Sequence, residues 1–160
     1  DGSVRDLGTL QVVYARPGSY PHDGIVADGW FYFTTIDGTL WALPLVDGAL
    51  PQPLLQGGNN ASTLPLLTRC WDVAEHTGKY GWCRGLLIES GSAGVTAVVG
   101  FTEVRQDRMP RHRWCARQPQ GSRTGLVWLD LTSGRQLGWV DLTDGERHSK
   151  LYSVLPWRGD

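Results

Sequence analysis

Hydrophobic and polar residues alternate with a period of two along several stretches of the chain. Leu10, Val12 and Tyr14 follow this pattern, and residues 126–131 and 136–142 behave similarly. Because neighbouring side chains of a β-strand point to opposite faces, the pattern predicts strands that bury one face. About ten short strands of this kind fit between the turn signals, which predicts an all-β fold, either a compact β-barrel or a β-sandwich.

Two β-hairpins are indicated most clearly. Residues 29–43 read as an aromatic strand, an Asp-Gly turn and a second apolar strand. Asp-Gly is typical of type I′ turns, in which both central residues need a positive φ. Residues 124–142 form a second predicted hairpin, which places Trp128 and Trp139 where they can pack near one another. The Gly-rich segment 90–94 is predicted as the turn of a further hairpin.

One segment has the spacing of a helix. Residues 66–77 are the longest stretch without Gly or Pro, at 12 residues, and their apolar side chains recur every three or four positions. This spacing predicts one short helix, and a strand through residues 70–73 is the alternative. Residues 50–65 are rich in Pro, Gly and Asn, which predicts a surface loop.

Length and composition limit the class of protein. The chain has 160 residues, of which 41% are hydrophobic and 19% charged, and this excludes an intrinsically disordered protein. We expect residues 1–160 to form a single domain, excised from a longer polypeptide because the first residue is not Met. No apolar run is long enough to cross a membrane as a helix, so we expect no membrane insertion. The net charge of −1 argues against a nucleic-acid partner.

Three cysteines and one glycosylation sequon are the candidates for covalent modification. Cys70, Cys83 and Cys115 include no Cys-x-x-Cys pair, so we predict no metal site. Cys70 and Cys83 flank a Gly-containing segment and are candidates for a disulfide in an extracellular setting, with three buried thiols as the alternative. Asn60 begins an Asn-Ala-Ser sequon in the predicted loop and is the candidate glycosylation site.

The motifs of common enzyme classes are missing from the sequence. Residues 90–94 approach the Gly-x-Ser-x-Gly nucleophile elbow, but serine replaces its first glycine and a strand-like run follows where a helix is required. The four histidines are scattered, and no phosphate-binding or dinucleotide-binding glycine loop is present. We therefore predict that the protein is not an enzyme and needs no cofactor. Two kinds of recognition protein, described below, are the leading hypotheses, and a small secreted hydrolase is the third.

The strongest candidate for recognition is a basic and aromatic segment at residues 105–117. Residues 101–125 contain six arginines against Glu103 and Asp107. Guanidinium groups bind carboxylates and sulfates in a bidentate manner, and an indole ring stacks on sugars and cations. The alternative is a solvated loop with its tryptophan in the core. The candidate residues are Arg108, Arg111, His112, Arg113 and Trp114.

A partial family resemblance gives the first recognition class. The aromatic strand at residues 30–33, the Gly-Thr-Leu-Trp step at 38–41, the loop rich in Pro and Asn, and the run at 86–90 resemble protruding capsid spike domains of astroviruses and hepeviruses. This resemblance implies a homodimeric β-module on the virion surface or in the extracellular space. It also implies binding to a host-cell receptor, either a glycan or a protein, and to antibodies. The eight Trp, five Tyr and three Phe are many for one small core, which also favours a dimer interface.

A propeller-like repeat gives the second class. Residues 28–48 have the strand, Asp-Gly turn and strand rhythm of a quinoprotein-type propeller blade, and residues 125–139 repeat it more faintly. The alternative function is therefore a secreted β-propeller-like binding protein or a fragment of one.

Overall fold

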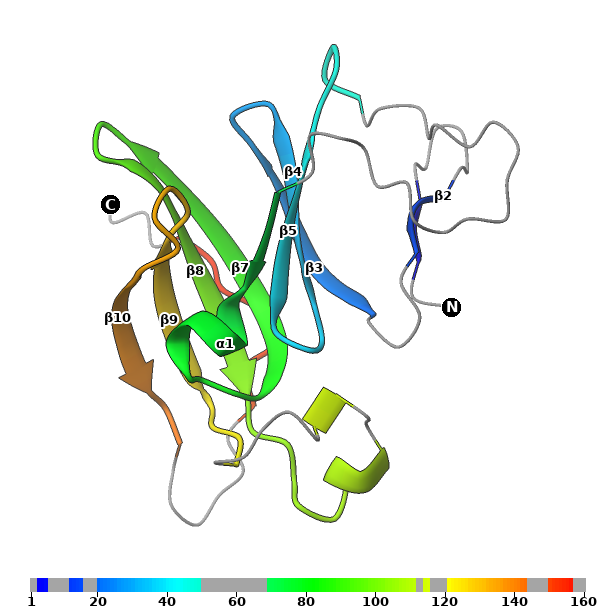
Figure 1. Cartoon of the computed structure of the whole chain (residues 1–160), viewed down its shortest axis with the longest axis vertical. Helices are drawn as coiled ribbons and strands as arrows, with labels where there is room; N and C mark the ends of the chain where they lie inside the picture. The colour runs from blue at the N-terminus through cyan, green and yellow to red at the C-terminus, as the bar shows by residue number, and fades with distance from the viewer. Residues whose placement is uncertain are drawn as a thin grey trace.

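Two four-stranded antiparallel sheets make up most of the protein (Figure 1). The computed structural model describes residues 3–5, 12–15, 20–49, 69–111, 114–115, 121–143 and 150–156. Sheet 1 has the strand order β3 (Pro21–Ala27), β4 (Trp30–Thr35), β5 (Thr39–Pro44) and β6 (Arg69–Asp72). Sheet 2 consists of β7 (Trp82–Gly91), β8 (Gly94–Thr102), β9 (Gly125–Asp130) and β10 (Gln136–Asp141), again in chain order. The short strands β1 (Ser3–Arg5) and β2 (Val12–Ala15) pair in a separate ribbon.

The main core lies between the two sheets. One edge strand of sheet 2, β7, approaches β3 and β4 of sheet 1. Apolar side chains from both sheets are buried there, including Tyr32, Leu40, Ala42, Val99, Phe101, Val127 and Leu129. The predicted all-β fold is confirmed as two facing sheets, although these sheets hold eight strands rather than ten.

The predicted hairpins form, but the turn at Asp37 and Gly38 is not of the predicted type I′: Gly38 has a φ of +89°, whereas Asp37 is not among the described residues with a positive φ. Strands β4 and β5 pair around Asp37 and Gly38, β7 and β8 pair around the Gly-rich turn, and β9 pairs with β10. The expected contact between Trp128 and Trp139 is wrong. Trp139 pairs with Val127 and points into the core, whereas Trp128 pairs with Gly138 on the opposite face of the sheet. A register shift between Gln136 and Gly138 precedes this pairing.

The segment with helical spacing divides into a strand and a helix. Residues 66–68 lie outside the described part of the chain, Arg69–Asp72 form β6, and α1 (Val73–Thr77) follows directly. The Asp72 side chain accepts a hydrogen bond from the Glu75 backbone N–H and caps the helix, and Gly78 ends it in the left-handed conformation. Both alternatives for this segment were therefore correct in part. Among the described residues, no helix has the length and apolar character needed to cross a membrane.

Polar contacts fix the two sheets against each other. The Asp23 carboxylate on β3 accepts a hydrogen bond from the Leu86 backbone N–H on β7 at 3.0 Å. The Asp28 carboxylate, in the β3–β4 turn, accepts a hydrogen bond from the Ser90 hydroxyl. At the other edge, the Trp71 indole N–H donates to the Leu131 carbonyl at 3.2 Å. These contacts tie both edges of the interface, so the sheets have one defined packing.

The cysteines do not form the candidate disulfide. Cys70 pairs with Trp41 on the face of sheet 1 that points away from sheet 2, and it is exposed. Cys83 lies in the core between the sheets and is fully buried. The two side chains therefore lie on opposite sides of sheet 1, and both remain thiols. Asn60 and the loop predicted at residues 50–65 lie outside the described residues.

We expect the three thiols to differ sharply in reactivity. Burial raises the pKa of Cys83 far above its ordinary value and also raises the pKa of Cys115. Only the thiolate attacks a disulfide reagent, so these two thiols are protected in the folded protein. Titration with a chromogenic aromatic disulfide should modify Cys70 alone under native conditions and all three thiols after denaturation. Rapid native modification of Cys83 would contradict its placement in the core.

Candidate anion-binding site

Three separate segments meet at the lower end of sheet 2. They are the start of β7, the loop that follows β8, with the short 3₁₀ helix η1 (Met109–Arg111), and residues 150–156 near the end of the chain. In Figure 1 the loop lies below the sheets, and the C-terminal segment passes behind β7 and β8. The sheet fixes the position of β7 and β8, so the site is built on a rigid base with a loop on one side.

Backbone contacts hold the C-terminal segment against β8. The Thr102 hydroxyl donates to the Leu151 carbonyl and accepts from the Leu151 backbone N–H, both at 2.9 Å. Gly100 leaves the space for this approach, because a Cβ atom there would lie 1.9 Å from the Leu151 Cδ2 atom. Gly85, at a φ of +77°, leaves similar space for Val154. Two glycines therefore position Lys150 and Tyr152 beside the start of β7.

A cavity of about 320 Å³ lies between these segments. This volume is at the lower end of the range for small-molecule sites. The lining combines four cationic side chains with two aromatic rings: Trp82, Arg84, Thr102, Val104, Arg105, Arg108, Lys150 and Tyr152. A cavity with this lining suits an acidic ligand that carries a ring.

Arg84 contacts both aromatic rings of the cavity. Its guanidinium carbon lies 4.9 Å from the centre of the Trp82 ring and 5.4 Å from the centre of the Tyr152 ring. The Nε atom is buried and has no hydrogen-bond acceptor among the described residues. Ring contacts of this kind orient a guanidinium and leave its in-plane N–H groups for an acceptor. An unmatched buried donor is costly in a folded protein.

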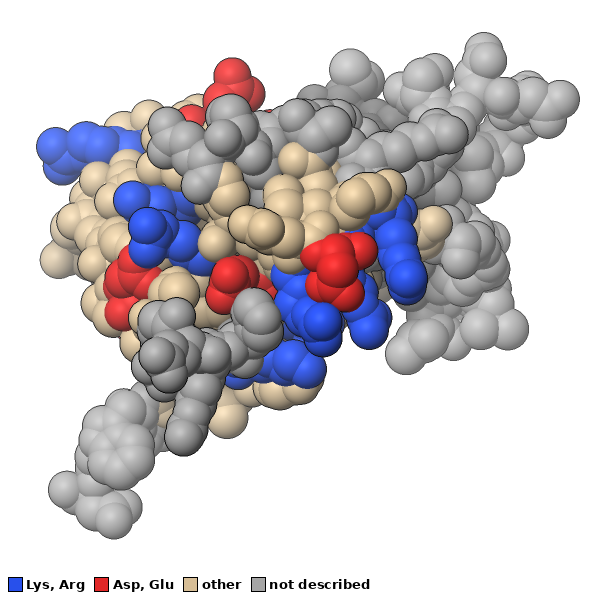
Figure 2. Space-filling model, turned by 90° about the horizontal axis from the view of Figure 1, so that it is seen from below, with Lys and Arg blue, Asp and Glu red and all other residues tan. Residues whose placement is uncertain are grey.

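The positive charge of the cavity is largely uncompensated. Arg105 forms an exposed ion pair with Asp107 at 3.0 Å. Within the described parts of the chain, no ion pair involves Arg84, Arg108 or Lys150. Figure 2, seen from below, shows Lys and Arg side chains gathered on this face with a few acids among them. Three cations therefore face the cavity or its rim without a carboxylate partner.

The guanidinium of Arg84 also acts on a neighbouring histidine. Burial lowers the pKa of His22 on β3, and the positive charge of Arg84 lowers it further, while Asp23 raises it. His22 is therefore neutral at neutral pH and adds no charge beside Arg84.

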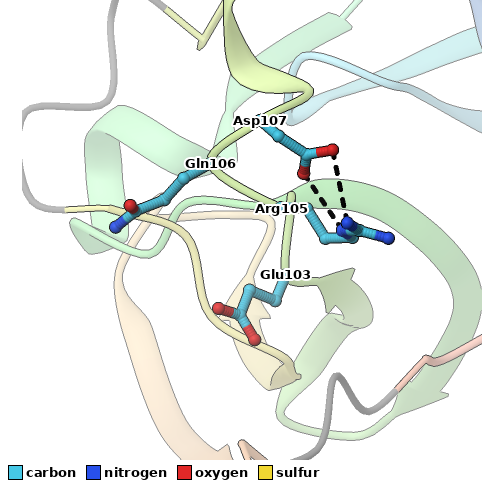
Figure 3. A pocket seen from close by; sticks show the side chains of 4 residues that line it. All are labelled: Glu103, Arg105, Gln106 and Asp107. Atoms are coloured by element: carbon cyan, nitrogen blue, oxygen red, sulfur yellow. Dashed lines mark hydrogen bonds and ion pairs between the residues drawn. The ribbon is translucent and has the colours of Figure 1, made fainter.

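A second, more polar cavity shares Arg105 with the first. It has a volume of about 350 Å³ and is lined by Glu103, Arg105, Gln106 and Asp107. Figure 3 shows two of the three nitrogens of the Arg105 guanidinium, Nε and Nη2, directed at the Asp107 carboxylate, with distances of 3.0 and 3.3 Å. The Glu103 side chain points away from this pair. Because the acids here already balance the one arginine, this cavity has less attraction for an anion than its neighbour.

The residues predicted from the sequence are divided by the structure. Arg108 lines the cavity, and Arg111 is exposed on η1. His112 and Arg113 lie outside the described residues. Trp114 is 7% exposed and packs edge-on against Trp82, with ring centres 6.3 Å apart. Trp114 is therefore a core residue that packs against Trp82 of the cavity lining. This agrees with the alternative interpretation, in which the tryptophan of the basic segment lies in the core and does not contact a sugar.

Six of the eight residues that line the cavity were not found from the sequence, and four of these six are cationic or aromatic. Trp82, Arg84, Lys150 and Tyr152 lie outside the basic segment and reach it only through the fold. The spacing of Trp82 and Arg84 was the one usable signal of a binding site. Residues two positions apart on a strand lie on the same face, so this spacing places a cation beside an aromatic ring. No local pattern marks Lys150 and Tyr152, since their position depends on Gly100 and Thr102.

Comparison of the chain with models of protein families, with curated proteins and with solved structures finds no match. Across the described residues, no group of three or more His, Cys, Asp or Glu side chains is arranged to hold a metal ion.

Proposed function

We propose that the chain is a non-enzymatic recognition domain that binds an acidic ligand in the cavity between β7, β8 and the C-terminal segment. One observation carries this proposal: Arg84, Arg108 and Lys150 line a cavity with two aromatic rings and have no carboxylate partner among the described residues. Cationic side chains beside aromatic rings suit carboxylated or sulfated saccharides, because the charges bind the acidic groups while a ring contacts the sugar.

The biological setting that we propose is a capsid spike. In this setting the acidic ligand belongs to a glycan or protein receptor on the host cell, and the exposed loops also meet antibodies. The domain would act as a homodimer on the virion surface or in the extracellular space. The two-sheet fold with a charged loop at one end supports this proposal, since binding residues are often carried by loops on a rigid β-scaffold.

The test is a glycan array on the wild-type domain and on the double variant Arg108→Ala/Lys150→Ala. Both side chains are exposed, so the variant should fold normally. We expect selective binding of acidic glycans by the wild type and at least tenfold weaker binding by the double variant, which loses two charge-assisted contacts. Arg135→Ala is the matched control, because Arg135 is exposed in the β9–β10 turn at the opposite end of sheet 2. Equal binding by all three proteins would contradict the proposal.

A second candidate, the propeller-like protein, is favoured by the sheet topology. Each sheet is a four-stranded up-and-down meander in chain order, which is the unit of a propeller blade. The third strands, β5 and β9, also share a pattern: residues 43–48 (LPLVDG) and 129–134 (LDLTSG) both read Leu-x-Leu-x-x-Gly. The final glycine has a positive φ in both, +76° at Gly48 and +71° at Gly134.

The two settings predict different neighbours in the parent reading frame. Further four-stranded units with the Leu-x-Leu-x-x-Gly pattern would favour the propeller. A basic shell region before the domain would favour the spike. The acidic-ligand cavity belongs to either setting, because it is formed by sheet 2 and its own loops.

A further inference from the structure

We infer that the ligand carries two separate oxyanion groups on a ring scaffold, one bound by Arg84 and the other by Arg108 and Lys150. This inference rests on the proposed recognition function and specifies its ligand class. A saccharide with two sulfate or carboxylate groups fits the description. The three cations lie in different environments: Arg84 is half-buried, whereas Arg108 and Lys150 are exposed.

Arg84 has the properties of an anchor for one anion. It is half-buried on β7, its guanidinium contacts two rings, and its Nε donor is buried without an acceptor in the described part of the chain. A guanidinium held in this way presents coplanar N–H donors that match the two oxygens of a carboxylate or sulfate. The donor is fixed before binding, so little conformational entropy is lost when the anion arrives.

Arg108 and Lys150 provide for a second anion. Both are exposed, and they come from different segments, the loop after β8 and the C-terminal segment. A single carboxylate on Arg84 would leave these two charges on the lining of the cavity without a carboxylate partner among the described residues. Like charges in one site repel, and a second anionic group removes that repulsion.

The aromatic rings favour a ligand larger than an inorganic ion. Tyr152 is 64% exposed, so part of its ring remains open after its contact with Arg84. A cavity of about 320 Å³ also exceeds the space that one sulfate needs. A sugar ring that joins the two anionic groups would contact Tyr152 and fill this space.

The test is calorimetric titration with a graded series of acidic disaccharides. Each contains one uronic acid and one hexosamine with no sulfate, one sulfate or two sulfates, and sodium sulfate is the ring-free probe. We expect affinity to rise about tenfold or more with the first sulfate, because this adds the second charge-assisted contact, and sodium sulfate to bind more weakly than either sulfated sugar. The unsulfated member tests whether one carboxylate alone is sufficient.

The decisive variant is Arg84→Lys, which keeps the positive charge and removes the planar donors. We expect it to bind the monosulfated disaccharide, whose carboxylate and sulfate are the two anions, about tenfold more weakly than the wild type, and Arg135→Ala to bind it normally. Circular dichroism and thermal denaturation check that each variant is folded. If Arg84→Lys does not fold, Arg108→Ala and Lys150→Ala test the two-anion inference in its place, because both residues are exposed. Each substitution should remove the preference for the sulfated over the unsulfated disaccharide.

The outcomes separate the two proposals. Wild-type binding by folded Arg84→Lys, or equal affinity for the unsulfated and disulfated sugars, would overturn the two-anion inference and leave the recognition function standing. Failure of every acidic saccharide to bind would overturn both, and the ligand would then be sought among proteins.

Discussion

Replacing Phe101 by alanine should destabilise the protein by about 3–5 kcal/mol, the largest effect expected from a single side chain here. Phe101 is fully buried on β8 and belongs to the core between the sheets. Its ring also reaches the β4–β5 turn, since a Cβ atom on Gly38 would lie 3.5 Å from the Phe101 ring. The substitution therefore removes apolar contacts to both sheets and leaves a cavity that rigid strands cannot close.

Equilibrium unfolding in urea measures this effect. Val140→Ala is the control, because Val140 is 44% exposed on the edge strand β10 and its replacement should cost less than about 1 kcal/mol. A loss below about 1 kcal/mol for Phe101→Ala would mean that the two sheets do not share a core.

The second large effect concerns Gly100→Val, which should disrupt the binding cavity from behind. The new side chain would overlap Leu151 and the Arg84 carbonyl, since even a Cβ atom would lie 1.9 Å from one and 2.2 Å from the other. The C-terminal segment must then leave β8, and Lys150 and Tyr152 leave the cavity with it. We expect a loss of about 1–3 kcal/mol in stability from overpacking and a loss of tenfold or more in affinity for acidic saccharides.

Gly91→Val is the matched control for this variant. Gly91 has open space around its Cβ position, so the same substitution should leave stability and binding nearly unchanged. Urea denaturation and calorimetric titration of both variants give the two readouts. Normal binding by a folded Gly100→Val protein would show that the C-terminal segment takes no part in the site.

The strand pairing was largely predictable from local sequence. The 29–43 hairpin and the turn at residues 90–94 follow from Asp-Gly and Gly-rich turns between apolar runs, and such turns fix which strands pair. The face on which Trp139 lies was not predictable, because the register shift in β10 reverses it relative to Trp128. Cys70 and Cys83 show the same limit: their separation depends on which face of a sheet each one occupies.

The binding site was predictable only in part. The arginine-rich segment identified Arg108, because charge density is visible in one dimension. Arg84, Lys150 and Tyr152 join it through long-range contacts that no local pattern encodes. Trp114 was misassigned to ligand stacking because an aromatic residue among arginines resembles a binding motif, whereas its neighbours in space are Trp82 and Val104.

The most direct test of the acidic-ligand cavity is an NMR titration of the ¹⁵N-labelled domain with the disulfated disaccharide. We expect the Trp82 indole N–H and the Arg84 Nε–H signals to shift together and saturably, because both groups line the cavity. The Trp71 indole N–H, which donates to the Leu131 carbonyl at the far edge of the sheet interface, should stay in place. Shifts confined to sheet 1, with Trp82 and Arg84 unchanged at saturation, would contradict the assignment of this cavity as the recognition site.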